Sequence, residues 1–211
     1  MGGIRVPKQT FFNLSEDKRR KLVNAIKEEF SRVPLHEASV ANIVQTAGIP
    51  RGSFYQYFED KEEAFYFLLE QYAKDNQETF IASLKKFDGD IFNAFIEMFQ
   101  ETLLFQNKEN GNFFRNTFLN MNYRMESTFT QRFNEVNASE HFLEIRKLMN
   151  TDKLNMTNEQ DLFHMMKMMM AITIQNLIQN FAEEVPFEKA MDNYMLEMNL
   201  LQRGFYKGDN K

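Results

Sequence analysis

Glycine and proline are scarce in this chain, and their scarcity is the strongest constraint on its fold. Only 8 glycines and 4 prolines occur among 211 residues. Because these residues mark most turns, a chain with so few of them forms few and long elements. Apolar residues recur every three or four positions along most of the sequence, which is the period of an amphipathic helix. We therefore predict an all-α protein of about nine helices.

The composition also narrows the class of protein. No cysteine occurs, which excludes disulfide bonds and thiolate metal sites. The N-terminal stretch MGGIRVPKQTFFNLSEDKRRK lacks the apolar core of a secretion signal. The longest apolar tract, MMKMMMAITI, is interrupted by Lys167 and is too short to cross a bilayer. We expect a cytoplasmic protein with no membrane partner.

Charge is distributed unevenly along the chain. Residues 1–61 carry 10 basic and 7 acidic side chains, whereas residues 62–211 carry 15 and 23. A basic N-terminal region followed by an acidic remainder favours contact with a polyanion through residues 1–61 alone. Chance scatter of charges is the alternative explanation.

The first two predicted helices have clear boundary signals. One helix begins near Ser15, whose hydroxyl can cap it, and ends before Pro34. The next helix runs from Ser39 to Ala47 and is followed by Gly48. Glycine is the residue that best adopts the left-handed conformation at the end of a helix.

A third predicted helix is short, from about Arg51 to Tyr57, and Phe54 and Phe58 face the core from it. A fourth helix begins after Asp60, which with Glu63 has the spacing of a capping box. Two helices joined by a tight turn with glycine, the second one short, describe a helix-turn-helix.

The short helix presents polar groups on its outer side. With Phe54 and Phe58 inside, the side chains left outside or at the rim are Arg51, Ser53, Tyr55, Gln56 and Tyr57. Such groups can form hydrogen bonds with base edges and phosphates of DNA. Gly52 allows close approach of the backbone to a phosphate, and Lys61 adds positive charge at the front of the next helix.

These residues resemble the tetracycline-repressor (TetR) family of bacterial regulators. The resemblance covers roughly Leu14 to Leu69 and rests on the stretch ASVANIVQTAGIPRGSFYQYFEDKEEAF. The matched positions are Ser39-Val40, Ile43, Ala47-Gly48, Gly52-Ser53, Phe54-Tyr55, Phe58 and Lys61. Beyond residue 70 only a compatible helical pattern remains. The resemblance implies a helix-turn-helix DNA-binding domain in residues 1–59 and a helical effector-binding and dimerisation domain in residues 60–211.

The resemblance also implies a role for each matched residue. Positions that touch phosphates are matched by Ser39, Tyr55, Tyr57 and Lys61. Positions that face bases are matched by Arg51, Ser53 and Gln56. Two departures matter. Pro50 stands where a capping serine is common, which puts one backbone N–H contact in doubt, and Ala41 replaces a residue that is polar or basic in some members.

The extension MGGIRVPKQTFF precedes the first helix and carries Arg5 and Lys8. Two interpretations stay open for it. It is either a disordered arm that reaches a minor groove or an irregular terminus without a role.

Residues beyond 90 are predicted to form long helices. The expected elements are a stripe of Phe92, Phe95, Phe99 and Leu103, one helix of about six turns from Phe114 to Val136, a short helix in SEHFLEIRKLMN, a central helix from Asn158 to Glu184, and a last helix from Pro186.

Phenylalanine and methionine are concentrated in this body. Eighteen of the 23 Phe and 13 of the 14 Met lie beyond residue 61. Together they can line an adaptable apolar cavity, although each one is also explained as a core residue. We predict a lipophilic effector pocket lined by Phe95, Phe99, Phe114, Phe118, Met121, Met125, Phe129, His164, Met166 and Met169.

The last two helices carry more apolar surface than one inward face needs, which favours a homodimer. The candidates for this contact are Ile172, Gln175, Gln179, Tyr194, Met198 and Leu201.

The histidines give weak signals for a metal or haem site. His36 is expected to be exposed. His141 with Glu144, and Asp161 with His164, have a spacing that could bind a metal, and His with Met could hold haem iron. We favour a solvated side chain for His141 and a hydrogen-bonded position at a pocket or core edge for His164.

No motif for nucleophilic, phosphate-binding or zinc-protease chemistry occurs. The acidic pairs Glu28-Glu29 and Glu62-Glu63 are interpreted as solvated helical faces. We expect neither an enzyme nor a metal or other cofactor. The main hypothesis is a dimeric DNA-binding transcriptional regulator, a repressor released from a palindromic operator by a lipophilic small-molecule effector. The alternative is a helical ligand- or haem-binding protein with a vestigial helix-turn-helix.

Overall fold

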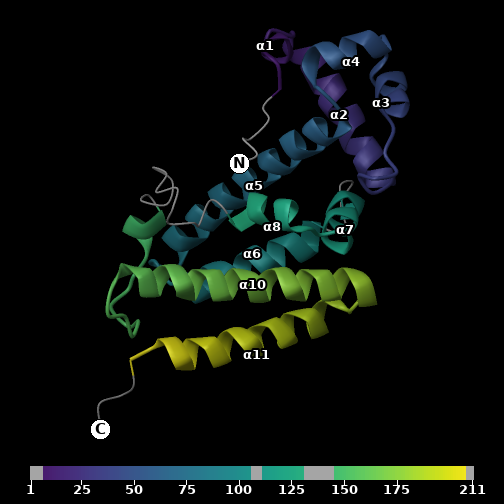
Figure 1. Ribbon diagram of the computed structural model, residues 1–211. Coiled ribbons are helices and arrows are strands. Elements are labelled where there is room, and N and C mark those ends of the chain that lie inside the picture. Colours follow the sequence, from purple (N-terminus) through teal and green to yellow (C-terminus); the bar gives the residue numbers. More distant parts are fainter. Residues whose placement is uncertain (1–6, 106–110, 131–144, 208–211) are drawn as a thin grey trace. The chain divides into compact units, whose positions relative to one another are not determined.

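The computed structural model of the protein describes residues 7–105, 111–130 and 145–207 (Figure 1). Within these ranges the regular elements are helices, with one isolated β-bridge between Leu154 and Tyr206. The predicted all-α fold is confirmed. The helices are α1 (Gln9–Phe12), α2 (Glu16–Arg32), α3 (Val40–Ala47), α4 (Arg51–Tyr57), α5 (Lys61–Lys86), α6 (Ile91–Phe105), α7 (Gly111–Leu119), α8 (Tyr123–Thr130), α10 (Glu159–Glu183) and α11 (Phe187–Phe205).

The described residues pack into two compact units. The first unit lies within Met1–Ala73 and Phe105–Met125, and the second within Lys74–Leu104 and Glu126–Lys211. Helix α5 therefore contributes to both units. The functional boundary that we predict between residues 59 and 60 stays a prediction.

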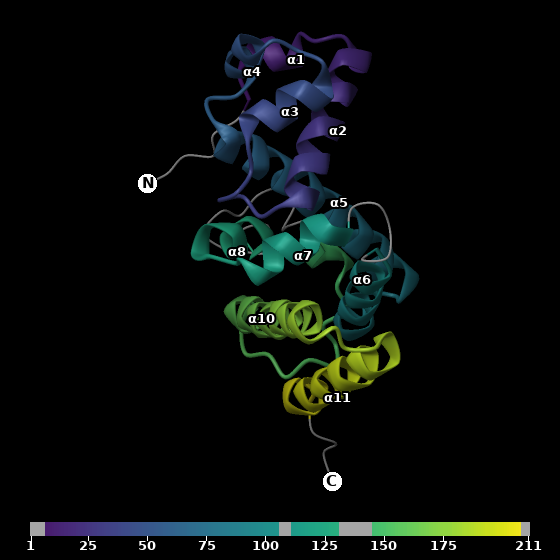
Figure 2. The same ribbon diagram turned by 90° about the vertical axis from the view of Figure 1, so that its right-hand side faces the viewer.

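Helix α2 is the centre of the first unit and packs against α3 and α7 (Figure 2). Its apolar residues Leu22, Ile26 and Phe30 are each 1% exposed. It begins after Ser15 and ends before Pro34, where Val33 is already extended. The predicted bounds of α2, α3 and α4 are thus confirmed.

A buried carboxylate joins α2 to the start of α3. Glu29 is 4% exposed, and its side chain accepts hydrogen bonds from the backbone N–H of Ser39 at 2.7 Å and from Arg32 Nε at 2.9 Å. Asn42 Nδ2 is a third donor, at 3.2 Å. Burial alone would raise the pKa of Glu29, but these donors hold the pKa below its ordinary value. The interpretation of this residue as a solvated side chain is wrong.

Glu63, the other acid interpreted as solvated, is also buried. It is 5% exposed, and its carboxylate accepts a hydrogen bond from the backbone N–H of Glu59. Its own N–H donates to Asp60 Oδ1 at 2.7 Å, which confirms that Asp60 caps α5. The predicted capping box is therefore modified, because Glu63 reaches one residue further back than Asp60.

The described part of the N-terminal extension is docked on the first unit. Phe11 is 1% exposed, with its ring centroid 5.2 Å from that of Phe58 and 5.0 Å from that of Phe67. The ammonium group of Lys8 donates to the carbonyl oxygen of Tyr55 at 2.8 Å. Neither predicted alternative, a disordered arm or an irregular terminus, describes residues 7–12. Arg5 lies outside the described residues.

Helix α7 completes the first unit although it lies far along the sequence. The ring of Phe113 stacks on Tyr72 at 5.0 Å between centroids. Asn116 Nδ2 donates to the carbonyl oxygens of Phe30 at 3.0 Å and Ser31 at 3.1 Å. These carbonyls lie in the last turn of α2, where helices leave acceptors unsatisfied.

The predicted single helix from Phe114 to Val136 is wrong in its described part. Helix α7 ends at Leu119 and α8 begins at Tyr123. Between them, Asn122 Oδ1 accepts hydrogen bonds from the backbone N–H groups of Arg124 and Met125, both at 3.0 Å. This side chain caps a new helix, which the apolar periodicity alone did not reveal. Residues 131–144 lie outside the described residues.

The second unit has an aromatic core. The predicted stripe on α6 is confirmed, with Phe92, Phe95, Phe99 and Leu103 all buried. Tyr194 on α11 stacks on Phe99 at 4.0 Å between ring centroids, and its hydroxyl lies 2.6 Å from Thr173 Oγ1 on α10. Burial raises the pKa of Tyr194. Helix α10 begins after Asn158, as predicted, and Asn158 and Asp161 form a capping box at its start.

The buried carboxylate of Glu29 provides a test of the first unit. Glu29→Gln keeps the side chain's size but replaces an acceptor oxygen with an amide group that meets donors. We expect the free energy of unfolding to fall by about 1–3 kcal/mol in urea titrations near neutral pH. Glu28→Gln is the matched control on an exposed neighbour and should change it by less than about 0.5 kcal/mol.

The same pair of variants predicts a pH dependence. Because the pKa of Glu29 in the folded protein is below its ordinary value of 4.5, its stabilisation is complete above that pH and is lost as the pH falls through the folded pKa. The stability difference between wild type and Glu29→Gln should therefore shrink in acid. A difference that is independent of pH would contradict the role of the ionised group.

Candidate nucleic-acid interface

The helix-turn-helix is held together by a few fully buried side chains. Ile43 from α3, and Phe54 and Phe58 at α4, are each 0% exposed. Gly48 follows α3 with φ of +66°, in the left-handed conformation that the sequence predicts. The backbone N–H of Ile49 donates to Val44 O at 3.1 Å, which closes the turn. This arrangement fixes which side of α4 faces outward.

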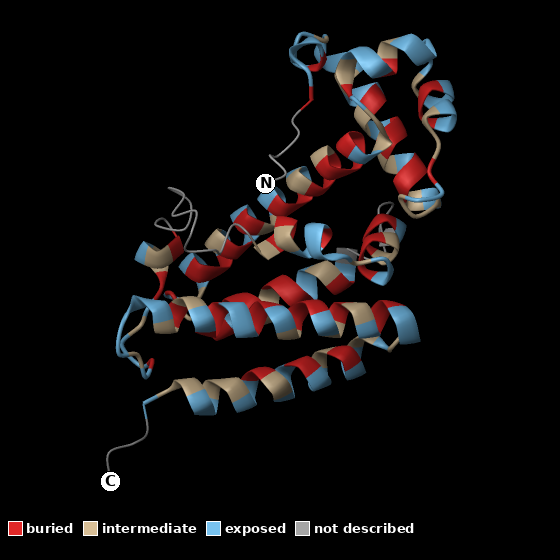
Figure 3. Ribbon diagram, in the orientation of Figure 1, coloured by how far each residue is buried: buried red, intermediate tan, exposed pale blue. Residues whose placement is uncertain are grey.

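Helix α4, most of which is exposed or half-buried (Figure 3), carries the predicted DNA contacts. Arg51, Tyr55 and Gln56 are exposed, and Tyr55 retains 40% of its surface. Ser53 and Tyr57 are half-buried at the rim. The structure thus brings these five side chains to one short helix, where guanidinium, amide and hydroxyl groups can meet base edges and phosphates.

Gly52 is also on this helix, and a Cβ atom added to it would meet nothing within 4 Å. Packing within the described chain therefore does not require glycine there, and the predicted approach of a phosphate to this backbone stays a prediction. Pro50 is the N-cap of α4 and forms no side-chain capping bond. The backbone N–H of Ser53 instead donates to Pro50 O at 2.9 Å.

Ser39 and Lys61 each bond to the backbone at or just before the start of α3. Ser39 Oγ accepts a hydrogen bond from the backbone N–H of Ala41 at 3.2 Å and so caps α3 as predicted. Lys61 Nζ donates to the carbonyl oxygens of His36 at 3.0 Å and Ala38 at 2.8 Å. The ammonium group therefore has a structural role in addition to its predicted charge, because it ties the start of α5 to the turn before Ser39.

Sequence reasoning missed two groups that shape this surface. Glu29 holds the start of α3, and Lys8 with Thr10 contacts the end of α4. A signal for Glu29 was available, since it stands three and seven residues after Ile26 and Leu22 and shares their helical face. No local pattern reveals the contacts of Lys8 and Thr10, which cross more than forty positions in the sequence.

The predicted effector residues are divided between the two units. The first unit contains Phe114, Phe118, Met121 and Met125, and the second contains Phe95, Phe99, Phe129, His164, Met166 and Met169. All of them are buried except Met121, which is half-buried, and His164. His164 is exposed on α10 beside the ring of Phe163, at 5.3 Å between centroids. Its placement in an apolar pocket or at a core edge must therefore be corrected. The pocket itself stays a prediction.

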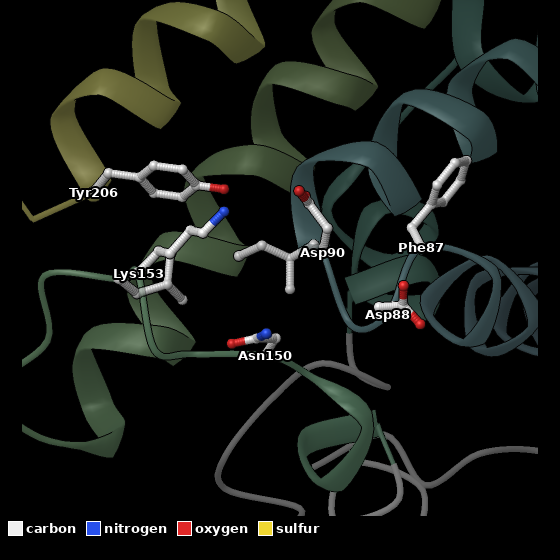
Figure 4. Close-up of a pocket in the computed structure, with 8 residues that line it drawn as sticks. Phe87, Asp88, Asp90, Asn150, Lys153 and Tyr206 are labelled. Carbon is white, nitrogen blue, oxygen red and sulfur yellow. The ribbon is translucent and has the colours of Figure 1, made fainter.

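A cavity of about 170 Å³ lies in the second unit beside the turn between α5 and α6 (Figure 4). Its lining consists of Phe87, Asp88, Asp90, Ile91, Asn150, Lys153, Leu154 and Tyr206. The lining is partly polar, and the predicted effector residues are not among these eight. The cavity is also smaller than the pockets of about 300–1,000 Å³ that hold drug-sized ligands.

The predicted dimer residues differ in their exposure. Gln175 and Gln179 on α10 are exposed, and Ile172 and Leu201 are half-buried. Tyr194 and Met198 are 0% and 1% exposed. These two must be corrected, because side chains that are already buried inside the unit have no area to offer a partner.

Other apolar side chains on α11 are exposed instead. Met195, Leu196 and Leu200 are 42%, 62% and 57% exposed. Leu196 and Leu200 are four residues apart and lie on one side of the helix.

Metal ligation and membrane insertion find no support in the parts of the chain that the structure describes. Those ranges contain no cluster of three or more His, Asp or Glu side chains placed to hold a metal ion. His36 is exposed as expected, and His141 lies outside the described residues. Across the same ranges, no helix combines the length and apolar content that a membrane crossing requires.

Two protein families match the sequence. The family described as "Bacterial regulatory proteins, tetR family" matches residues 22–65. The family described as "Tetracyclin repressor-like, C-terminal domain" matches residues 90–205, which is more than half of the chain.

A curated relative is similar in the N-terminal region. The uncharacterized HTH-type transcriptional regulator YdgC of Bacillus subtilis (strain 168) is 43% identical over 49 residues, which are 23% of this chain and 25% of that protein. The matched stretch thus spans about a quarter of that relative's length.

Solved structures share the fold over most of the chain. SmeT, the repressor of the Stenotrophomonas maltophilia multidrug efflux pump SmeDEF, has a TM-score of 0.64 and 16% identity, covering 92% of this chain and 94% of its own. FadR of Bacillus subtilis in complex with stearoyl-CoA has a TM-score of 0.60 and 14% identity, covering 89% and 99%. The helix-turn-helix geometry and the two family matches agree, and the chain belongs to the TetR family of bacterial transcriptional regulators.

Proposed function

We propose that this regulator is a dimeric repressor that leaves a palindromic operator when a lipophilic small molecule binds. The observation that carries the DNA-binding part is the outward side of α4, where Arg51, Tyr55 and Gln56 are exposed on a helix anchored by Phe54 and Phe58. Their guanidinium, hydroxyl and amide groups are of the kinds that bond to base edges and phosphates of DNA.

In the proposed complex, Arg51, Ser53 and Gln56 contact bases, and Ser39, Tyr55, Tyr57 and Lys61 contact phosphates. The two copies of α4 enter successive major grooves, about 34–36 Å apart on a simple two-fold site. Most of the binding energy then comes from phosphates, so affinity falls steeply as salt increases.

The exposed leucines of α11 support the dimeric state. Leu196 and Leu200, with Met195, form an apolar surface that a second copy of the chain can cover by two-fold symmetry. The exposed Gln175 and Gln179 on α10 add polar groups to the proposed contact. A dimer also explains why a regulator with one short reading helix per chain suits a palindromic operator.

Release requires that the effector changes the helix-turn-helix. Helix α7 lies in the stretch that matches the C-terminal-domain family, yet Asn116 donates to the last carbonyls of α2 in the first unit. Helix α5 likewise contributes to both units. A ligand that shifts α7 or α5 can therefore act on the reading helices, provided that it binds the two states with different affinity.

The lipophilic class of effector rests on the buried phenylalanine and methionine side chains. One protein of this fold, FadR of Bacillus subtilis, was solved with stearoyl-CoA, which carries a long acyl chain. That likeness is one of fold, so it supports the class of effector by analogy alone.

Substitutions of Arg51 and Lys61 are predicted to weaken DNA binding in different ways. Arg51→Ala should cost about 1–3 kcal/mol on a selected duplex and relax one base preference, because it removes a base contact. Lys61→Ala should weaken selected and random duplexes alike and lower the salt slope by about one, because it removes a phosphate contact. Fluorescence anisotropy across a salt series measures both quantities.

Lys189→Ala is the control for these variants, because it removes one exposed charge from α11 in the second unit. It should change neither affinity nor salt slope. An equal loss for Arg51→Ala on random and selected DNA would contradict its assignment as a base contact.

The effector prediction is tested by thermal unfolding with a series of fatty acyl compounds of increasing chain length. A ligand at about 100 times its dissociation constant should stabilise the protein by roughly 2.7 kcal/mol. Short, water-soluble acids of the same charge serve as controls and should have no effect. If no acyl chain length raises the unfolding temperature, the buried methionines and phenylalanines serve only as core residues and line no effector pocket.

The dimer prediction is tested by light scattering at micromolar concentration. The wild type should have twice the 25.1 kDa mass of the chain. The double variant Leu196→Glu with Leu200→Glu should be monomeric, because it places charges in the proposed contact. Tyr123→Glu, at a residue that is 85% exposed in the first unit, is the matched control and should stay dimeric. A monomeric wild type would refute the dimer.

A further inference from the structure

The end of the reading helix α4 is held by residues that precede the whole helix-turn-helix. A helix leaves its last four carbonyl oxygens without partners inside the helix. In α4 these belong to Phe54, Tyr55, Gln56 and Tyr57. The N–H of Phe58 satisfies the first of them at 2.9 Å.

The other three carbonyls are satisfied by two residues of the N-terminal segment. The ammonium group of Lys8 donates to Tyr55 O at 2.8 Å, and the backbone N–H of Lys8 donates to Tyr57 O at 2.9 Å. The hydroxyl of Thr10 donates to Gln56 O. Every carbonyl that the end of α4 leaves open therefore has a donor.

The segment that supplies these donors is itself anchored. Phe11 is 1% exposed and packs against the rings of Phe58 and Phe67. Helix α1 and α4 lie side by side in both views (Figures 1 and 2). Lys8 and Thr10 therefore belong to a packed segment, which holds their donor groups beside the end of α4.

We propose that Lys8 and Thr10 are positioning residues of the reading helix: they clamp the end of α4 and so orient the side chains that read DNA bases. The inference rests on the proposed DNA-binding function. A seven-residue helix is too short to keep its form alone, so its orientation depends on contacts from outside. The positive ammonium group of Lys8 also interacts favourably with the C-terminal end of α4, where the helix dipole is negative.

The clamp gives Lys8 a different role from a phosphate contact, and the two roles have different signatures. A phosphate contact weakens binding to all duplexes and lowers the salt slope by about one when it is removed. A clamp leaves the salt slope unchanged, because no counterion release is lost. Loss of the clamp lowers the affinity for the preferred sequence more than the affinity for random DNA.

Three variants of the full chain separate these roles. Lys8→Met removes the ammonium group but keeps the backbone bond to Tyr57. Thr10→Val removes the hydroxyl donor but keeps the size of the side chain. Thr10→Ser keeps a hydroxyl donor. Gln9→Ala is the matched control, because among the described residues the Gln9 side chain bonds only to Asn13 within the same segment.

Two measurements are made on each variant. The first is the ratio of affinities for a duplex selected by the wild type from a randomised pool and for a random duplex, across a salt series. The second is hydrogen exchange at the amide of Phe58, which reports the end of α4, compared with the amide of Phe30 in α2. The exchange measurement needs no DNA.

We expect Lys8→Met and Thr10→Val to lower the affinity ratio about 2- to 10-fold at an unchanged salt slope. Exchange at Phe58 should accelerate by a similar factor while exchange at Phe30 stays the same. Thr10→Ser and Gln9→Ala should behave as wild type.

The proposal is overturned if Lys8→Met lowers the salt slope by about one and weakens both duplexes equally, because Lys8 is then a phosphate contact. It is also overturned if exchange at Phe58 is unchanged in both variants, or if exchange accelerates and the affinity ratio does not move. If the wild type selects no duplex, the proposed function fails, and the exchange arm still decides whether the clamp exists.

Discussion

Burial of two phenylalanine rings, Phe54 and Phe58, is the interaction on which the reading surface depends. Both are fully buried: Phe54 lies on a helix of only seven residues, and Phe58 is the residue that directly follows it. So short a helix gains too little from its own hydrogen bonds to be stable alone. Its form and direction therefore come from what it packs against. The polar groups on its other side are exposed as a consequence of that anchoring.

Polar side chains that bond to helix ends also fix the arrangement of the helices in the first unit. Glu29 and Glu63 are ionisable, yet both are almost fully buried, and each accepts hydrogen bonds from backbone N–H groups near a helix start. Lys61 and Asn116 do the converse and donate to carbonyl oxygens of the first unit. A buried polar or charged group is costly unless donors or acceptors compensate it. The two buried carboxylates and the half-buried Lys61 and Asn116 thus hold the ends of helices at defined positions.

Much of the fold followed from local patterns. The bounds of α3 and α4, the left-handed Gly48 and the start of α10 are set by residues within one or two turns of each other. The break between α7 and α8 was missed because Asn122 interrupts an apolar stripe that is otherwise continuous. The buried Glu29 was missed because an acidic pair usually marks a solvated face, and only its position on the stripe argued otherwise.

The sequence by itself determined the all-α class, the helix-turn-helix and the outward set of Arg51, Tyr55 and Gln56, because helical periodicity and turn residues act between near neighbours. Tertiary structure alone decided that Lys8 and Thr10 meet the end of α4, that Asn116 meets the end of α2, and that Tyr194 is buried inside its unit. These contacts join residues that lie far apart along the chain. No local pattern encodes such a contact, because its partners are brought together only when the apolar faces pack.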